Sequence, residues 1–183
     1  MKRNYPLLVL ILLLVQSCCF TNGEEIGRIY FTPEEKAIIP YADNQTIQFI
    51  TDEDFEFQLN TTVSSTFYSD QDFCEDYTSY ENYQVYLNSE LPTLDVQLSL
   101  QNRYNGEDDD DTLYVAITIN NAWFDYDFSE PLETVEINGT TYTDVYHYYS
   151  GVLDNPISVV FYSYTFGILK INYLNGDYAQ INS

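Results

Sequence analysis

Leu94-Asp95-Val96-Gln97-Leu98-Ser99-Leu100 is the stretch that decides the fold, because apolar and polar residues alternate through it without a break. Successive side chains of a β-strand point to opposite faces of the sheet, so this alternation is typical of a strand with one buried face and one solvated face. Residues 55–59, Phe-Glu-Phe-Gln-Leu, repeat the pattern. No sustained 3.6-residue periodicity follows Pro40, and the sequence therefore predicts an all-β fold.

Further strands are expected wherever runs rich in Val, Ile, Thr, Tyr and Phe stand between Gly, Asn and Asp turns. Such runs lie at residues 46–50, 63–68, 80–87, 113–119 and 159–164. Two Asn-Gly pairs predict tight hairpins, since both residues of such a pair readily adopt the positive φ angles of a type I′ turn. They join residues 134–137 with 141–148 through Asn138-Gly139, and 168–174 with 177–181 through Asn175-Gly176.

The connections between these runs are short, and helices that could carry a parallel crossover are missing. We therefore expect an antiparallel meander that curls into a sandwich or an open barrel. One short helical turn is expected before it. Thr32 is an N-cap residue, Pro33 suits the first helical position, and two glutamates follow, so the turn is predicted to reach Ile38 before Pro40 stops it.

The first residues differ in kind from the rest of the chain. Lys2 and Arg3 precede an apolar run over residues 6–15, and Gln16-Ser17-Cys18 follows it. This order is typical of an export signal. A membrane-spanning helix needs about 20 apolar residues, and the run supplies about half of them, so it is too short to remain as an anchor. The alternative of a buried core helix is disfavoured by the basic residues before the run and the small or polar ones after it.

Val15-Gln16-Ser17-Cys18 resembles the lipobox of bacterial lipoproteins, with an aliphatic residue three positions before the cysteine and a small one directly before it. The resemblance implies that Cys18 becomes the mature N-terminus and carries a diacylglyceryl group and an amide-linked acyl chain such as palmitate. Cys19 is a competing thiol, and plain secretory cleavage is the alternative. Residues 1–17 are thus interpreted as the signal peptide, 18–28 as lipidated N-terminus and tether, and 29–183 as a single β domain.

The chain as a whole resembles the small cell-envelope lipoproteins of Bacteroidota that have no characterised activity. Three stretches carry this likeness: the signal that ends at Cys18, residues 30–49 with Thr32-Pro33-Glu34-Glu35, and residues 162–176 with the final Asn-Gly pair. The resemblance implies a lipid-anchored location, at the bacterial outer membrane, and it brings no catalytic motif. The middle of the chain matches no pattern of that group.

The net charge of −23 restricts the partners. After Cys18 all 29 acidic residues remain, and the bases are Arg28, Lys36, Arg103 and Lys170. A phosphate-binding face needs clustered Lys and Arg, so nucleic acid and anionic lipid surfaces are disfavoured. The charge is compatible with divalent cations, with basic partners, or simply with solubility.

Two acidic runs are the candidates for metal binding. One is Asp108, Asp109, Asp110 and Asp111, in a loop after Asn105-Gly106, and the other is Asp70, Asp72, Glu75 and Asp76. Their oxygens are hard ligands of the kind that calcium prefers, but neither run has the spacing of an EF-hand. We favour solvated loops for both, and calcium is the one cofactor left open.

Catalytic residues are not marked out by the sequence. Nucleophilic catalysis needs a Ser or Cys beside a base, and His147 is the only histidine. Nothing in the sequence brings it to Cys74, so a structural or surface imidazole is expected. Paired carboxylates could hydrolyse glycans, but with 29 acids no pair is distinguished.

The densest aromatic cluster is Trp123-Phe124-Asp125-Tyr126-Asp127-Phe128, around the single tryptophan. Strand alternation places Trp123 and the two acids on one face and the other aromatic residues on the opposite face. If the acidic face is exposed, Trp123 would be a platform on which a sugar could stack. The interpretation we favour from sequence is that these aromatics fill the sheet core and form cross-strand pairs.

The sequence thus favours a non-enzymatic module of the cell envelope, which binds a ligand or a partner protein or acts as a spacer. A carboxylate-dependent glycan hydrolase and a calcium-dependent adhesion module are the alternatives.

Overall fold

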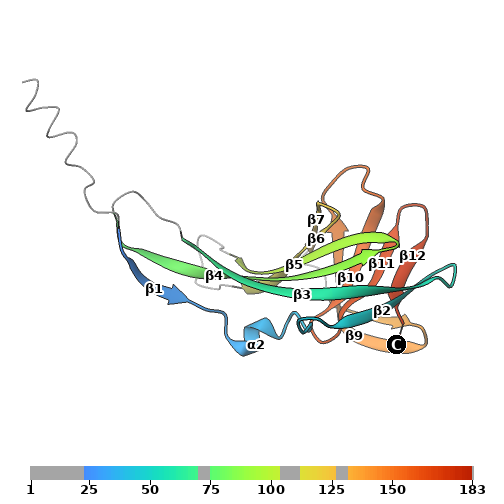
Figure 1. The fold of residues 1–183 in the computed structure, drawn as a ribbon. Coiled ribbons are helices and arrows are strands. Elements are labelled where there is room, and N and C mark those ends of the chain that lie inside the picture. Colours follow the sequence, from blue (N-terminus) through green and yellow to red (C-terminus); the bar gives the residue numbers. More distant parts are fainter. Residues whose placement is uncertain (1–22, 70–74, 104–111, 127–131, 183) are drawn as a thin grey trace, which may run out of the picture. The chain divides into compact units, whose positions relative to one another are not determined.

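The computed structural model describes residues 23–69, 75–103, 112–126 and 132–182. In these ranges it contains one helix, α2, and strands β1 to β12 (Figure 1). Their bounds are β1 Glu25–Ile29, α2 Pro33–Lys36, β2 Thr46–Thr51, β3 Glu56–Ser69, β4 Tyr77–Glu90, β5 Thr93–Arg103, β6 Thr112–Ile119, β7 Ala122–Tyr126, β8 Glu133–Ile137, β9 Thr140–Ser150, β10 Ile157–Ser163, β11 Gly167–Tyr173 and β12 Tyr178–Ile181.

Ten strands form a closed antiparallel barrel. The order is β4-β3-β2-β12-β11-β10-β9-β7-β6-β5, and pairing of β4 with β5 completes the ring. The predicted all-β antiparallel fold is confirmed, and the sheet closes completely instead of remaining an open barrel. Among the described strands, β8 pairs with β9 alone. Strand β1 pairs with β4 in the parallel direction, and the sequence had not indicated this pairing.

The stretch that decided the fold lies in β5. Its apolar residues Leu94, Val96, Leu98 and Leu100 are all buried in the barrel core. Leu98 stands between Val85 of β4 and Ile117 of β6 in the pairing register. Val96 likewise stands between Leu87 of β4 and Ile119 of β6. Because these apolar positions meet apolar partners on both neighbouring strands, the two-residue alternation directly sets which face of the sheet turns inward.

The segment before β2 packs into the same core. Thr32 caps α2 through a capping box with Glu35, as the predicted N-cap implied, although the helix ends at Lys36 rather than at Ile38. Ile39 and Tyr41 are buried beyond it. None of the described helical residues forms a segment that is long and apolar enough to cross a bilayer.

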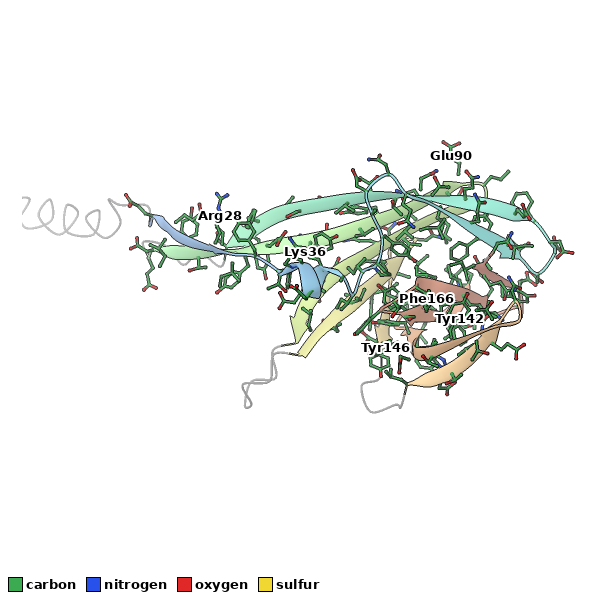
Figure 2. The ribbon with its side chains drawn as sticks, turned by 90° about the horizontal axis from the view of Figure 1, so that it is seen from below. Arg28, Lys36, Glu90, Tyr142, Tyr146 and Phe166 are labelled. Carbon is green, nitrogen blue, oxygen red and sulfur yellow. The ribbon has the colours of Figure 1, made fainter. Side chains whose placement is uncertain are left out.

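A smaller core lies under the β8–β9 hairpin. It consists of Ile137, Tyr142, Val145 and Leu169. Tyr142 meets the ring of Phe166 edge-on, with centroids 5.2 Å apart (Figure 2). Both residues of the predicted turn have positive φ, 49° at Asn138 and 74° at Gly139, so the type I′ prediction is confirmed there.

Other local predictions need correction. Residues 55–59 and 63–68 were expected as two strands, but β3 runs through both. At the last hairpin only Gly176 has a positive φ, so the hairpin forms but its turn is not type I′. Asn120 and Asn121 form a turn between β6 and β7, with φ of 49° and 66°, which was not predicted from the sequence.

The contacts of the chain gather into two compact units. One holds Met1–Tyr30 and Phe67–Glu81, and the other holds Phe31–Thr66 and Asn82–Ser183. In the first unit β1 already begins at Glu25, although residues 18–28 were expected as a tether. Arg28 pairs with Glu25 at 2.8 Å, and this hydrogen-bonded guanidinium lowers the pKa of the carboxyl group to about 2. Arg28 also lies over the ring of Phe67.

Candidate functional site

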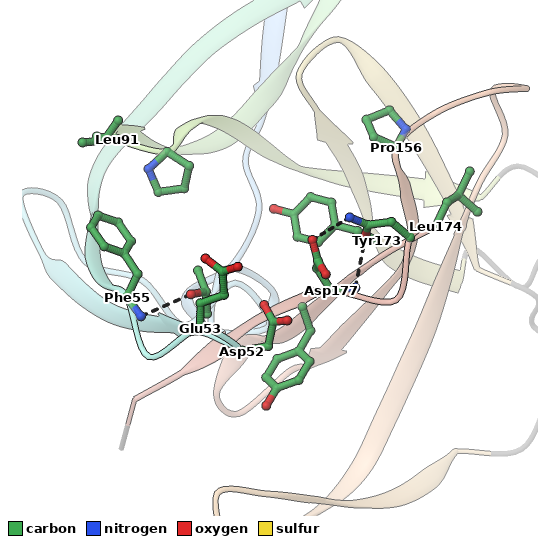
Figure 3. Close-up of a pocket in the computed structure, with 12 residues that line it drawn as sticks. Asp52, Glu53, Phe55, Leu91, Pro156, Tyr173, Leu174 and Asp177 are labelled. Carbon is green, nitrogen blue, oxygen red and sulfur yellow. Dashed lines mark hydrogen bonds between the residues drawn. The ribbon is translucent and has the colours of Figure 1, made fainter.

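Four connections meet at one end of the barrel, because the strands that they join alternate in direction around the ring. They are the β2–β3 turn, the β4–β5 turn, the β9–β10 connection and the β11–β12 turn. Together they enclose a pocket of about 750 Å³ (Figure 3). This volume falls within the range of about 300–1,000 Å³ that small-molecule sites occupy.

The walls of this pocket, hereafter the end pocket, are mainly apolar. Phe55, Leu91, Pro92, Pro156 and Leu174 contribute most of the apolar side chains, and the rings of Tyr173 and Tyr178 lie beside them. Three of these residues are unusually exposed for their type: Phe55 at 46%, Leu91 at 73% and Leu174 at 67%. Apolar side chains that converge on a concavity in this way mark a binding surface more often than isolated exposed residues do.

The charged groups of the end pocket are all acidic. Asp52, Glu53 and Asp177 line it, and neither Lys nor Arg is among its lining residues. The ring of Tyr178 already contacts one cation, since the ammonium group of Lys170 lies 4.2 Å from its centroid. Three carboxylates around an apolar pocket favour a ligand that combines an apolar body with a positive charge.

Backbone hydrogen bonds hold the loops around the end pocket together. In the β2–β3 turn the Thr51 amide donates to the Phe55 carbonyl at 3.0 Å, and the Phe55 amide donates to Thr51 Oγ1 at 3.2 Å. The turn is joined to β12 by the Asp52 amide, which donates to the Tyr178 carbonyl at 3.2 Å.

The opposite wall is tied in the same way, because the Leu174 amide donates to the Pro156 carbonyl at 2.8 Å. The walls therefore belong to a formed site rather than to free loop tips.

A cluster of tyrosines fills part of the barrel interior between β7, β9 and β10. Tyr146 stacks on Tyr164 with centroids 4.4 Å apart, and Tyr126 meets Tyr146 edge-on at 4.8 Å. Tyr162 donates its hydroxyl hydrogen to the Ile38 carbonyl at 2.7 Å. Burial, and to a lesser degree the neighbouring phenols, raise the pKa of Tyr148 and of Tyr162 well above the ordinary range.

Tyr148 differs from its neighbours in this cluster. It is buried, and its hydroxyl group has no hydrogen-bond partner in the structure. A buried hydroxyl left unpaired costs about 1–3 kcal/mol. An unpaired buried hydroxyl group in a folded protein calls for an explanation, and one explanation is a bound ligand that supplies the missing hydrogen-bond partner.

The structure places Trp123 on the outside of the barrel. It is 49% exposed, and Asp125 on the same face of β7 is exposed as well, whereas Phe124 is buried. The alternation predicted for residues 123–126 is therefore correct. The interpretation favoured from sequence, that the aromatic residues fill the core, holds for Phe124 but not for Trp123. Asp127 and Phe128 lie outside the described residues.

Several other residues named from sequence also fall outside the described ranges. They are Cys18, Cys74, Asp70, Asp72 and the run Asp108, Asp109, Asp110 and Asp111. Within the described ranges no group of three or more His, Cys, Asp or Glu side chains is placed to hold a metal ion. His147 lies 3.6 Å from Glu133 and meets Phe161 edge-on.

The end pocket was not predicted from the sequence. Its walls come from four turns that are far apart along the chain, and only closure of the barrel brings them together. A local signal was present, however, because Phe55, Leu91 and Leu174 are large apolar residues in or next to turns, where polar residues are the rule.

Comparison with known proteins finds that no protein family, no curated protein and no solved structure matches this chain. The fold and the pockets therefore define the class, which is a closed ten-stranded antiparallel β-barrel with a pocket among the loops at one end.

Proposed function

We propose that this chain is an exported, lipid-anchored protein of the cell envelope whose barrel binds, without catalysis, an apolar ligand with a positively charged group. The proposal of ligand binding is supported by the end pocket, where five apolar side chains converge beside three carboxylates. Apolar walls bind the body of such a ligand, and the carboxylates bind its charged group and select against anions.

The sequence before the barrel supports export and anchoring. The basic start, the short apolar run and Ser17-Cys18 form the signal, and Cys18 is the thiol that receives lipid. Each buried methylene contributes about 0.8 kcal/mol to membrane binding, so several acyl chains on one residue hold the protein firmly where a single chain would not. The bilayer is thus a partner through lipid rather than through the acidic protein surface.

Ligand binding is tested with amphiphiles that share one alkyl chain and differ in the head group. Dodecyltrimethylammonium, dodecyl sulfate and a zwitterionic dodecyl compound, each below its micellar concentration, are titrated into the purified protein in a calorimeter. The cationic compound is expected to bind at least tenfold more tightly than the other two, because only its head group has a net positive charge to complement the carboxylates. Equal affinity for the sulfate would contradict the proposal.

Variants locate the binding site. The double substitution Asp52→Asn with Glu53→Gln removes two charges from the pocket and should weaken cation binding about tenfold, while Leu174→Ala should weaken all three amphiphiles. Glu136→Gln is the matched control, since Glu136 is an exposed acid on β8 that does not line the pocket. If this control lowers affinity as much as the pocket variants do, the ligand is responding only to net charge.

Anchoring is tested separately by Cys18→Ser in the full precursor. We expect the variant to lose acyl groups from its N-terminal peptide in mass spectrometry and to leave the membrane fraction, whereas Cys19→Ser should retain both. An N-terminal peptide that carries no lipid in the unaltered protein would refute the anchor and leave the pocket proposal standing.

A further inference from the structure

Trp123 forms a fixed aromatic surface on the side wall of the barrel. The outer part of its six-membered ring lies against the backbone of Gly151, where a Cβ atom would come within 2.2 Å of the indole. The Gly151 amide also donates to the Trp123 carbonyl at 3.2 Å. Only glycine permits this approach, so the ring is held in place while half of its surface stays exposed.

A cleft of about 550 Å³ opens beside this ring, where β6 and β7 stop pairing. The two strands pair over only three positions, from Ile119 opposite Ala122 to Ile117 opposite Phe124. Residues from both faces of the sheet line the cleft, among them the exposed Trp123 and Asp125 and the buried Tyr148.

The lining of this cleft differs from that of the end pocket. Polar side chains from three strands stand around it, namely Gln101 of β5, Tyr114 and Thr118 of β6, and Asp125 of β7. The Tyr114 hydroxyl donates to Gln101 Oε1 at 2.8 Å, which fixes both side chains relative to each other. A flat indole beside several hydrogen-bonding groups suits a ligand with an apolar face and many hydroxyl groups.

Tyr148 gives an independent indication that the cleft takes a ligand. This residue lines the cleft, only 1% of its surface is exposed, and its hydroxyl group is the one tyrosine hydroxyl among the described residues that is both buried and without a hydrogen-bond partner. A ligand hydroxyl that reaches the inner part of the cleft would complete its hydrogen bonding.

We propose that this cleft binds a neutral hexopyranose, whose C–H face stacks on Trp123 and whose hydroxyl groups bind Asp125 and the inner phenol of Tyr148. Stacking on an indole needs no charge on the ligand, and the nearby carboxylate of Asp125 accepts hydrogen bonds from sugar hydroxyls while it repels anionic sugars. The inference is independent of the end pocket, with which the cleft shares no residue.

The single tryptophan provides the experiment, because Trp123 is the only one in the chain and its fluorescence reports on this cleft alone. Methyl glucoside, methyl galactoside and methyl mannoside are titrated into the full-length protein, with methyl glucuronide as the anionic counterpart. We expect a saturable change in emission with at least one neutral glycoside and at least tenfold weaker binding of the glucuronide.

Two variants test the assignment. Asp125→Asn should weaken binding about tenfold, whereas Asp144→Asn, an exposed acid on β9 that does not line the cleft, should leave it unchanged. Tyr148→Phe removes a hydroxyl group that has no partner in the protein, so it should lower sugar affinity without lowering the melting temperature. No saturable change with any neutral glycoside, or equal binding by the protein and both cleft variants, would overturn the proposal.

Discussion

The ring of Tyr41 occupies the space beside Gly167 that a side chain at that position would need. A Cβ atom on Gly167 would lie 2.1 Å from the Tyr41 hydroxyl oxygen, and that oxygen accepts a hydrogen bond of 2.6 Å from the Ile168 amide. The two partners of this bond are 127 positions apart in the sequence. The segment before β2 is therefore joined to the start of β11 by both packing and hydrogen bonding.

Gly167→Ala is expected to destabilise the protein by at least about 2 kcal/mol. The residue has a φ of 79°, which costs about 1–2 kcal/mol for a residue with a Cβ, and the new methyl group would also displace the Tyr41 ring. Gly139→Ala is the control, because Gly139 has a φ of 74° but nothing within 4 Å of its Cβ position. Urea unfolding of both variants should show the larger loss at 167. Equal losses would mean that backbone strain alone accounts for the effect.

Leu98→Ala should lower the free energy of unfolding by about 2–5 kcal/mol, the usual cost of emptying a fully buried leucine site. Leu98 has no exposed surface and lies in the core of the barrel. Asp95→Ala in the same strand changes an exposed side chain and should cost less than about 0.5 kcal/mol. Denaturant unfolding followed by circular dichroism compares the two, and similar losses would contradict the inward orientation of Leu98.

Thr61→Val should cost about 1–3 kcal/mol, because it removes two hydrogen bonds that join a buried hydroxyl group to partly buried backbone groups, and each such bond contributes about 0.5–1.5 kcal/mol. The Thr61 hydroxyl donates to the Ala42 carbonyl and accepts from the Gln45 amide at 2.8 Å, and the residue is buried. Thr46→Val is the matched comparison, since its hydroxyl bonds to Asn60 in an exposed position. If both variants lose the same stability in thermal unfolding, burial does not make the Thr61 hydrogen bonds more stabilising than exposed ones.

Alkaline unfolding is expected from the buried tyrosines. Burial raises the pKa of Tyr41, Tyr148, Tyr162 and Tyr164 above the ordinary value of 10.0. The folded state thus retains protons that the unfolded state releases, so this contribution to stability is complete below about pH 10 and declines as the pH rises further. Tyrosinate absorbance should show a late phase that coincides with loss of the circular dichroism signal.

Tyr148→Phe provides the check on that assignment. It removes one of the phenol groups whose pKa is raised, so the midpoint of alkaline unfolding should move to higher pH. Complete ionisation of all tyrosines with an unchanged circular dichroism spectrum would show that the cluster is open to solvent.

The strands were predictable because their signal is local. In residues 94–100 of β5 every second residue is apolar, and at Asn138-Gly139 the turn depends on two adjacent residues. Closure of the ring was not predictable, since it depends on β4 pairing with β5 along one edge while β3 occupies the other, and no short pattern encodes that. The β1–β4 parallel pair escaped for the same reason, because its partners are about 50 residues apart.

The candidate sites likewise include residues that a local pattern identified and residues that only the folded chain brings together. Trp123 was singled out from sequence because strand alternation placed it beside acids, and the exposure of that face was the condition for a sugar-stacking role. The end pocket depends on four separate turns, and the inner part of the cleft depends on Tyr148, which sequence could place on a strand but not opposite Tyr126 of β7.

The early start of β1 leaves only a short segment between this strand and the lipid that we propose on Cys18. Only seven residues, from Cys18 to Glu24, separate the acylated thiol from the first strand. At about 3.5 Å per residue such a leash extends no more than about 25 Å, whatever its conformation. The start of β1 would therefore remain in a thin layer of fluid directly above the headgroups.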